Sequence, residues 1–150
     1  MRYVMISFLV LAACDRGSGG APGGGAGRAK WSPAGKRWAE ELTRMLPEMM
    51  CTEKMYFVSC FKASQDECQR VMRTETDRCL DQHADVVPLV VDAVSGSEAG
   101  RQIGQCAGGA AEGVLRARGL FKDTPLCSDI DHWARVAKDA AQDVTPKPKR

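Results

Sequence analysis

The amino-acid sequence predicts an all-α fold, a small bundle of four to five helices held together by disulfide bonds. In several segments between residues 31 and 144, apolar residues recur at the three- and four-residue spacing of amphipathic helices. Serine or proline stands where several of these segments begin. No pair of strand-like segments is available to form a sheet, and a lone strand is not stable. Helices are therefore expected throughout this region.

The first helix is expected to begin at Ser32 and Pro33, with serine as the cap and proline in the first position. We expect Pro47 to interrupt or restart this helix. The continuation from Glu48 to Phe61 is apolar on most sides and is predicted to be the buried centre of the domain. The apolar positions before Pro47 are Trp38, Leu42, Met45 and Leu46.

Ser64 and Glu67 have the spacing of a capping box and predict the start of the second helix. One face of that helix is apolar and is expected to be buried. Its members are Cys68, Val71, Met72, Cys79 and Leu80. The opposite, charged face is expected to be solvated, and it holds Arg70, Arg73, Glu75 and Asp77.

The segment Val86 to Val94 is rich in β-branched residues, but without a partner strand we predict a short helix starting at Pro88. A further helix is expected from Ser97 to Arg118 and should end at Gly119. It carries glycines four residues apart, at Gly100, Gly104 and Gly108. Such a pattern favours close packing against another helix of the domain, with self-association as the alternative.

The last helix is expected from Ser128 to Asp143, with Ser128 and Asp131 as a cap pair. An apolar stripe runs along it. The stripe comprises Ile130, Trp133, Ala134, Ala137, Ala141 and Val144.

Six of the seven cysteines lie in the helical region, an even number that indicates three disulfides in an oxidising compartment. Sequence alone permits 15 pairings. If the segments around Cys51 and Cys60 and around Cys68 and Cys79 fold as an antiparallel hairpin, the pairs are Cys51–Cys79 and Cys60–Cys68. Cys106–Cys127 would then join the last two helical segments. This arrangement is similar to the twin-cysteine α-hairpin pattern, although its intervals differ.

The hairpin geometry carries one further requirement. Nine residues rotate an ideal helix by about 900°, which places Cys60 on the face opposite Cys51. The first helix must therefore end or distort before Cys60. The alternative for the cysteines is a metal or redox site, but the sequence contains no Cys-x-x-Cys motif.

The N-terminus has a basic residue, Arg2, and then an apolar run from Val4 to Ala13 that only Ser7 interrupts. This run is too short to span a bilayer, which needs about 20 residues, but it suits the apolar core of a signal peptide. The end of the run, Leu11-Ala12-Ala13-Cys14, resembles the lipobox of bacterial lipoproteins.

The resemblance implies that residues 1–13 are a signal peptide and that Cys14 receives a diacylglyceryl group and a further fatty acyl chain such as palmitate. Several acyl chains give stable anchoring. The protein is then expected in the bacterial cell envelope, lipid-anchored on the periplasmic or the cell-surface side of a membrane. Assigning Cys14 to lipid also leaves the even number of six cysteines for disulfides.

Two segments flank the predicted domain of residues 31–144. Residues 14–30 contain the lipidated cysteine and a glycine-rich stretch without large apolar side chains, and are expected to be a flexible tether with a reach of about 20–25 Å. Residues 145–150 form a basic tail. We interpret this tail as a frayed terminus, with contact to anionic lipid headgroups as the alternative.

Charge and motifs exclude several classes of function. Removal of residues 1–13 lowers the formal net charge from +2 to +1, and the charges are interspersed, so no nucleic-acid partner is expected. His83 and His132 lack a metal-ligand spacing, and neither a nucleophile elbow nor a phosphate-binding loop is present. We therefore expect no enzyme, no metal site and no cofactor.

Four methionines within eleven residues offer one alternative. Met45, Met49, Met50 and Met55 carry thioethers, which are soft ligands for Cu(I). The neighbouring aromatic residues Tyr56, Phe57 and Phe61 favour core packing instead.

Together these features predict a membrane-anchored binding module for a protein or another envelope component. An inhibitor of an exported toxin would be a specific form of it. A structural or assembly accessory of an envelope complex is the alternative, and copper binding the third. A hydrolase would need a concave pocket with a strongly perturbed carboxylate or histidine.

Overall fold

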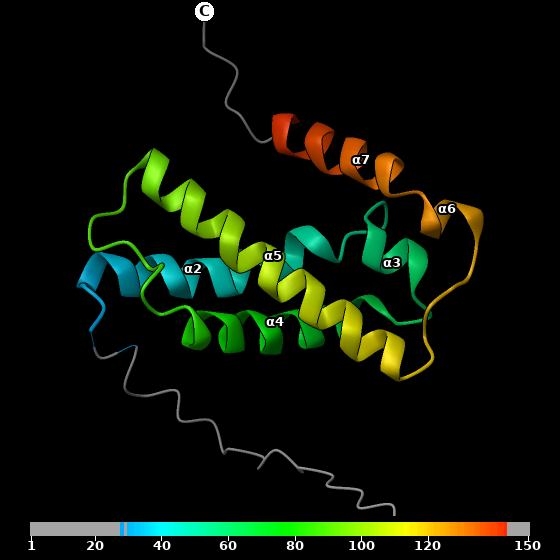
Figure 1. The fold of residues 1–150 in the computed structure, drawn as a ribbon, viewed down its shortest axis with the longest axis horizontal. Coiled ribbons are helices and arrows are strands. Elements are labelled where there is room, and N and C mark those ends of the chain that lie inside the picture. Colours follow the sequence, from blue (N-terminus) through cyan, green and yellow to red (C-terminus); the bar gives the residue numbers. More distant parts are fainter. Residues whose placement is uncertain (1–27, 29, 144–150) are drawn as a thin grey trace, which may run out of the picture.

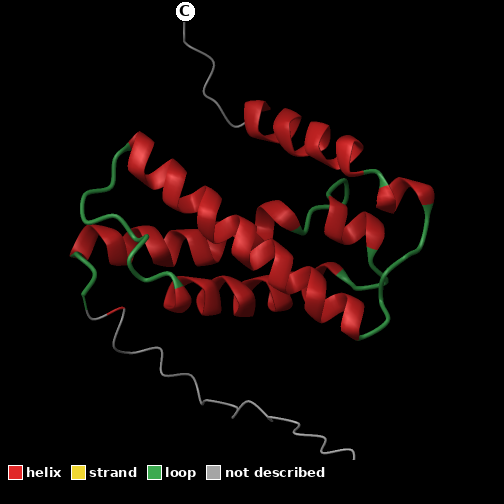
Figure 2. Ribbon diagram, in the orientation of Figure 1, coloured by secondary structure: helices red, strands yellow, loops and turns green. Residues whose placement is uncertain are grey.

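The computed structural model describes residue 28 and residues 30–143, and this part of the chain contains six helices and no strand (Figure 2). The predicted all-α class is therefore confirmed. The described part of the chain has more helices than the predicted four to five, and two of the six are only five and four residues long. In chain order the helices are α2 (Pro33–Met50), α3 (Tyr56–Cys60), α4 (Gln65–Gln82), α5 (Ala93–Ala117), α6 (Pro125–Ser128) and α7 (Ile130–Asp143). Within the described residues, none of the helices combines the length and apolar character that crossing a bilayer requires.

Helices α2, α4 and α5 pack as a three-helix bundle (Figure 1). Helix α4 is antiparallel to both of the others. The Nε1 of Trp31, just before α2, donates to the carbonyl of Ala84 just after α4, at 2.8 Å. At the other end, Arg118 after α5 reaches Glu67 in the first turn of α4, at 3.3 Å. The core between the helices includes Val71, Met72, Leu80, Ile103 and Leu115.

The first two helix starts are confirmed. The side chain of Ser32 accepts a hydrogen bond from the amide of Gly35, and that of Ser64 from the amide of Glu67. Pro47, however, lies inside α2 and does not interrupt it. The proline costs one intrahelical hydrogen bond, but its ring is fully buried, which offsets that loss.

The chain leaves the helical conformation at Cys51 and re-enters it only at Tyr56. The expectation that the first helix ends before Cys60 is therefore confirmed. The segment from Glu48 to Phe61 is the buried centre only in part. Phe57, Cys60 and Phe61 are buried, whereas Met49 at the end of α2 is 47% exposed.

The prediction of a short helix from Pro88 was wrong. This segment is a loop, and α5 begins only at Ala93. The carboxylate of Asp92 accepts hydrogen bonds from the amides of Val94 and Ser95, at 2.9 and 2.8 Å, and the Ser95 hydroxyl completes a capping box. Asp92 thus satisfies two of the amides that have no partner within the helix, and the helix starts directly after it.

The apolar face predicted for α4 is buried as expected, but one acid predicted on the solvated face is not exposed. Glu75 is only 6% exposed, while its ion-pair partner Arg78 is largely in solvent. Glu75 lies one turn from Val71 and one turn from Cys79, so the helix geometry places it at the margin of the buried stripe.

The glycine stripe of α5 packs within the domain, as predicted. A Cβ atom at Gly100, Gly104 or Gly108 would lie 3.8–3.9 Å from Trp38, Leu46 or Met50 of α2, respectively. Such distances are ordinary contacts, so α2 and α5 lie close but leave room for alanine. The helix ends at Gly119, whose φ of 70° is readily available only to glycine.

The structure contradicts all three predicted disulfides. The bonds are Cys51–Cys68, Cys60–Cys127 and Cys79–Cys106, with Cα–Cα distances of 5.9, 5.4 and 6.0 Å. The prediction of Cys51–Cys79, Cys60–Cys68 and Cys106–Cys127 assumed an antiparallel hairpin in which Cys60 and Cys68 flank the turn. Because α2 ends at Met50, its C-cap Cys51 instead meets the first turn of the antiparallel α4, and the last turn of α4 meets the middle of α5.

The start of α7 also differs from the prediction. Ser128 belongs to α6, and Asp129 caps α7 by accepting a hydrogen bond from the amide of His132 at 2.8 Å. The proposed cap pair of Ser128 and Asp131 is therefore wrong. The one-turn helix α6 takes up Ser128 because Thr124 caps Cys127 and Pro125 fixes the first helical residue.

Candidate functional site

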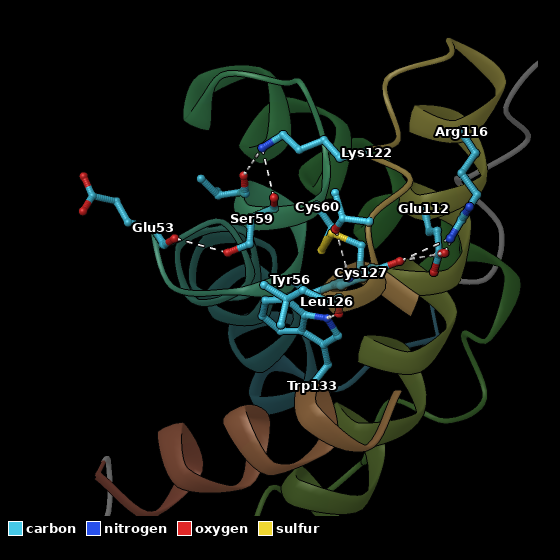
Figure 3. Close-up of a disulfide and its surroundings, with 12 residues drawn as sticks. Glu53, Tyr56, Ser59, Cys60, Glu112, Arg116, Lys122, Leu126, Cys127 and Trp133 are labelled. Atoms are coloured by element: carbon cyan, nitrogen blue, oxygen red, sulfur yellow. Dashed lines mark hydrogen bonds and ion pairs between the residues drawn. A yellow bond between two sulfur atoms is a disulfide. The ribbon is translucent and has the colours of Figure 1, made fainter. Parts of the chain in front are cut away.

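A groove of about 790 Å³ separates α7 from the side of the molecule formed by α3 and the end of α5. Tyr56 projects into it from α3, Glu112 and Arg116 from α5, and Trp133 from α7 (Figure 3). Phe121, in the connection that follows α5, completes the wall. It is larger than three other hollows on the described part of the chain, which have volumes of about 340, 400 and 440 Å³.

Aromatic rings form the apolar lining of the groove. Tyr56 meets Trp133 edge to face with ring centroids 5.5 Å apart, and it meets Phe61 in the same way at 5.7 Å. The Trp133 Nε1 donates to the carbonyl of Leu126 at 2.9 Å, which fixes the orientation of the indole (Figure 3). The wall is therefore rigid, and its polar edges are satisfied.

Three polar side chains form a connected set on the α5 side. The hydroxyl of Tyr56 donates to Oε1 of Glu112 at 3.0 Å, and Nε of Arg116 donates to the same oxygen at 2.7 Å. The guanidinium of Arg116 lies over the ring of Phe121, 3.6 Å from its centroid. This arrangement combines a charge-assisted hydrogen bond with a cation–π contact.

Burial raises the pKa of the Tyr56 hydroxyl above its ordinary value of 10.0, and the neighbouring Glu112 carboxylate raises it further. The hydrogen bond to Glu112 likewise raises the pKa of Arg116. At neutral pH the Tyr56 phenol therefore keeps its proton and the Arg116 guanidinium is a cation.

The Cys60–Cys127 disulfide and a set of backbone hydrogen bonds support the groove. The amide of Lys62 donates to the carbonyl of Leu120, and the amide of Lys122 donates to that of Cys60, at 2.7 and 2.8 Å. The ammonium of Lys122 also donates to the carbonyls of Val58 and Ser59, at the C-terminal end of α3 (Figure 3). A cation at a helix C-terminus is electrostatically favourable.

The rim of the groove exposes one large apolar side chain. Ile130, in the opening turn of α7, lines the groove and is 81% exposed. An apolar rim beside an aromatic wall suits contact with another apolar side chain.

The residues that the sequence singled out lie mostly elsewhere. Cys14 is outside the described residues. His83 caps α4 through its backbone amide, whereas His132 stands edge-on to Trp133 at 4.8 Å. Among the described residues, no three side chains of histidine, cysteine, aspartate or glutamate are grouped so that they could hold a metal ion.

The methionine group is less buried than expected. Met45 and Met49 are 37% and 47% exposed, because they lie one turn apart on the solvent side of α2. Met50 and Met55 are half-buried. Core packing therefore does not account for the exposed pair.

The sequence analysis named Tyr56, Ile130 and Trp133 only as core or stripe residues and did not predict that they line a groove. Glu112 and Arg116 stand four residues apart on a predicted helix, and this spacing does indicate an ion pair. No local pattern indicates that Tyr56, Phe121 and Trp133 meet, because long-range packing and a disulfide bring them together.

Comparison with known proteins identifies one family. The family model described as "T2SS substrate NttA" matches residues 34–114, which is more than half of the 150 residues and covers α2, α3, α4 and most of α5. No curated protein and no solved structure matches the chain. The chain belongs to the T2SS substrate NttA family and so to a family of secreted bacterial proteins.

Proposed function

We propose that this protein is an exported binding module that uses the groove between α7 and the α3–α5 side to hold a segment of a partner protein. The observation that carries the proposal is the exposed Ile130 beside the rigid pair of Tyr56 and Trp133. Ile130 is 81% exposed at the edge of an aromatic hollow, and burial of this side chain by a partner would lower the free energy of the complex.

The residue types support a protein partner. Tryptophan, tyrosine and arginine dominate the energetic centres of protein interfaces, and the groove places Trp133, Tyr56 and Arg116 together. Their rings and the guanidinium are already held by internal contacts, so little conformational entropy is lost on binding. The chemistry fits an extended segment with an apolar or aromatic anchor and a hydrogen-bonding group that faces the Glu112–Arg116 pair.

We further propose that the protein works in the bacterial envelope or beyond it, held by a lipid on Cys14. Membership of a family of secretion substrates supports export, as does the presence of three disulfides. The lipobox-like sequence before Cys14 supports the anchor.

The test is affinity isolation of the full-length, tagged protein from its producing bacterium under mild detergent. The wild type is compared with Ile130→Asp and with Met49→Asp, which places the same charge on an exposed apolar residue of α2, away from the groove. We expect one protein to be recovered with the wild type and with the Met49 variant and to be lost with the Ile130 variant. Equal recovery with all three would overturn the groove as the binding site.

A further inference from the structure

The loop between α4 and α5, together with the first turn of α5, presents a second apolar surface, at the end of the molecule opposite the groove. Leu89, Val90 and Val91 of the loop are 71%, 74% and 38% exposed, and Val94 in the first turn of α5 is 81% exposed. We call these four residues the apolar loop. Figure 1 shows this connection at the end of the bundle where α2 begins, whereas α3 and α6 lie at the other end.

The loop holds a fixed shape that turns these side chains outward. The hydroxyl of Ser32 donates to the carbonyl of Leu89 at 2.7 Å, and that of Ser95 donates to the carbonyl of Val90 at 3.0 Å. On the inner side, the buried Val87 packs into the core. The exposure of the apolar residues is thus a consequence of the fold.

These hydrogen bonds also lower the free-energy cost of transferring the loop from water into an apolar medium. A backbone carbonyl without a partner is costly in the hydrocarbon region of a bilayer. The two carbonyls between the outward-facing side chains, those of Leu89 and Val90, are already satisfied by serine side chains of the protein. These two carbonyls can therefore leave water without losing a hydrogen bond.

The chain enters the domain beside the apolar loop. Arg28 donates to the backbone carbonyl of Asp77 at 3.0 Å and pairs with Asp81, which holds the entering chain against the last turns of α4. Trp31 follows, and its Nε1 donates to the carbonyl of Ala84 at the start of the same connection. Residues 1–27 precede this point, and in the sequence they include the apolar run from Val4 to Ala13 and Cys14.

From the position of the entering chain we infer that the apolar loop is a membrane contact: it inserts its side chains into the interfacial region of a phospholipid bilayer and turns the groove away from that surface. This contact rests on the proposed lipid on Cys14, which would hold the point where the chain enters the domain, and with it the apolar loop, within reach of the bilayer. Apolar side chains at such a surface enter by about 5–10 Å.

Charge is a minor part of this contact. Lys30 and Lys36 are exposed near the start of α2, while Asp85 and Asp92 are exposed in the connection itself. The carboxylate of Asp92 is engaged with two amides of α5, and these hydrogen bonds lower its pKa. Because the two signs are balanced, binding should depend on apolar burial and only weakly on salt.

The test uses the mature full-length protein and vesicles of phosphatidylethanolamine and phosphatidylglycerol with brominated acyl chains, which quench tryptophan fluorescence. One variant carries Leu89→Trp and the other Ile130→Trp, both at highly exposed apolar positions. Trp31, Trp38 and Trp133 are common to both and supply the baseline.

We expect brominated lipid to quench the additional emission of the Leu89→Trp variant and to leave that of the Ile130→Trp variant unchanged, at low and at high salt. Equal quenching at both positions would mean that the domain lies on the bilayer without orientation and would overturn the inference. Absence of quenching at position 89 would also overturn it, and would leave the apolar loop as a surface for a protein.

A double variant, Leu89→Ser with Val90→Ser, provides a second measurement. Both side chains are more than two-thirds exposed, so the thermal unfolding midpoint should match that of the wild type. If the loop contacts the bilayer, limited proteolysis of the vesicle-bound protein should cleave the variant between α4 and α5 faster than the wild type. Equal cleavage rates would contradict the inference.

Discussion

Cys60 and Cys127 are covalently joined, with Cα atoms 5.4 Å apart, although they stand 67 positions apart in the sequence. This bond fastens α6 to the end of α3, and α7 follows directly after α6. The other two disulfides link α4 to the end of α2 and to α5. The three-helix bundle and the groove are thus fastened by different disulfides.

The first prediction concerns removal of this bond. The double variant Cys60→Ser with Cys127→Ser should lose the ordered groove while α2, α4 and α5 remain folded. The loop-entropy relation assigns the bond about 4 kcal/mol, because it closes a long loop. Hydrogen exchange should show loss of protection in residues 121–143 and retained protection in α4.

The matched control is Cys79→Ser with Cys106→Ser, which removes a bond inside the bundle. We expect that variant to lose protection in α4 and α5 as well. If the two double variants lost protection in the same regions, the bundle and the groove would form one unit and the separation described above would be wrong.

The second prediction contrasts two glycines. At Gly35 a Cβ would lie 2.9 Å from the carbonyl oxygen of Pro88, which is backbone and cannot move aside easily. Gly35→Ala should lower the free energy of unfolding by about 1–3 kcal/mol. At Gly109 nothing lies within 4 Å, so Gly109→Ala should raise it by roughly 0.5–1 kcal/mol. Urea unfolding of both variants measures the two effects, and changes of the same sign would contradict the packing of α2 on the loop.

The third prediction concerns the start of α7. The carboxylate of Asp129 caps the helix, whereas Ser128 belongs to α6. Asp129→Ala should therefore destabilise α7 by about 1 kcal/mol, as seen in faster amide exchange of its first turn, and Ser128→Ala should leave the exchange rates unchanged. If Ser128→Ala speeds the exchange and Asp129→Ala does not, Ser128 caps α7, as the sequence pattern predicted.

The fourth prediction follows from the raised pKa of Tyr56. The folded state holds the phenolic proton more tightly than the unfolded state, so this contribution is fully present below pH 10 and is lost as the pH rises through the folded-state pKa. The wild type should lose stability above pH 10 more steeply than Tyr56→Phe. Thermal unfolding across that range tests this, and ultraviolet absorbance of tyrosinate gives the ionisation directly. Parallel pH profiles for the two proteins would show that the phenol is not buried against Glu112.

Local rules predicted the parts of the fold that depend on neighbouring residues. The caps at Ser32 and Ser64, the buried face of α4 and the end of α5 at Gly119 each follow from a pattern only a few residues long. The disulfide pairing failed because it depended on one boundary. Because α2 ends at Met50, Cys51 lies opposite Cys68 near the start of the antiparallel α4, and not opposite Cys79 near its end.

These local rules did not predict the candidate site. Tyr56 and Trp133 are 77 positions apart and meet only because Cys60–Cys127 carries the chain back to α3. The exposure of Ile130 also contradicts the regular apolar stripe expected for α7, since Trp133 packs on the domain and Ile130 does not. The helical spacing of apolar residues shows that a helix has an apolar face, but it does not show whether the same domain covers that face.

The central claim, that the groove binds a partner protein, is tested most directly by replacing Ile130 with a photoreactive amino acid in the producing bacterium. Met49, exposed on α2, serves as the control position. After illumination we expect position 130 to form one protein adduct and position 49 to form none, with the crosslinked mass identifying the partner. Absence of an adduct at position 130, or the same adducts at both positions, would contradict the account.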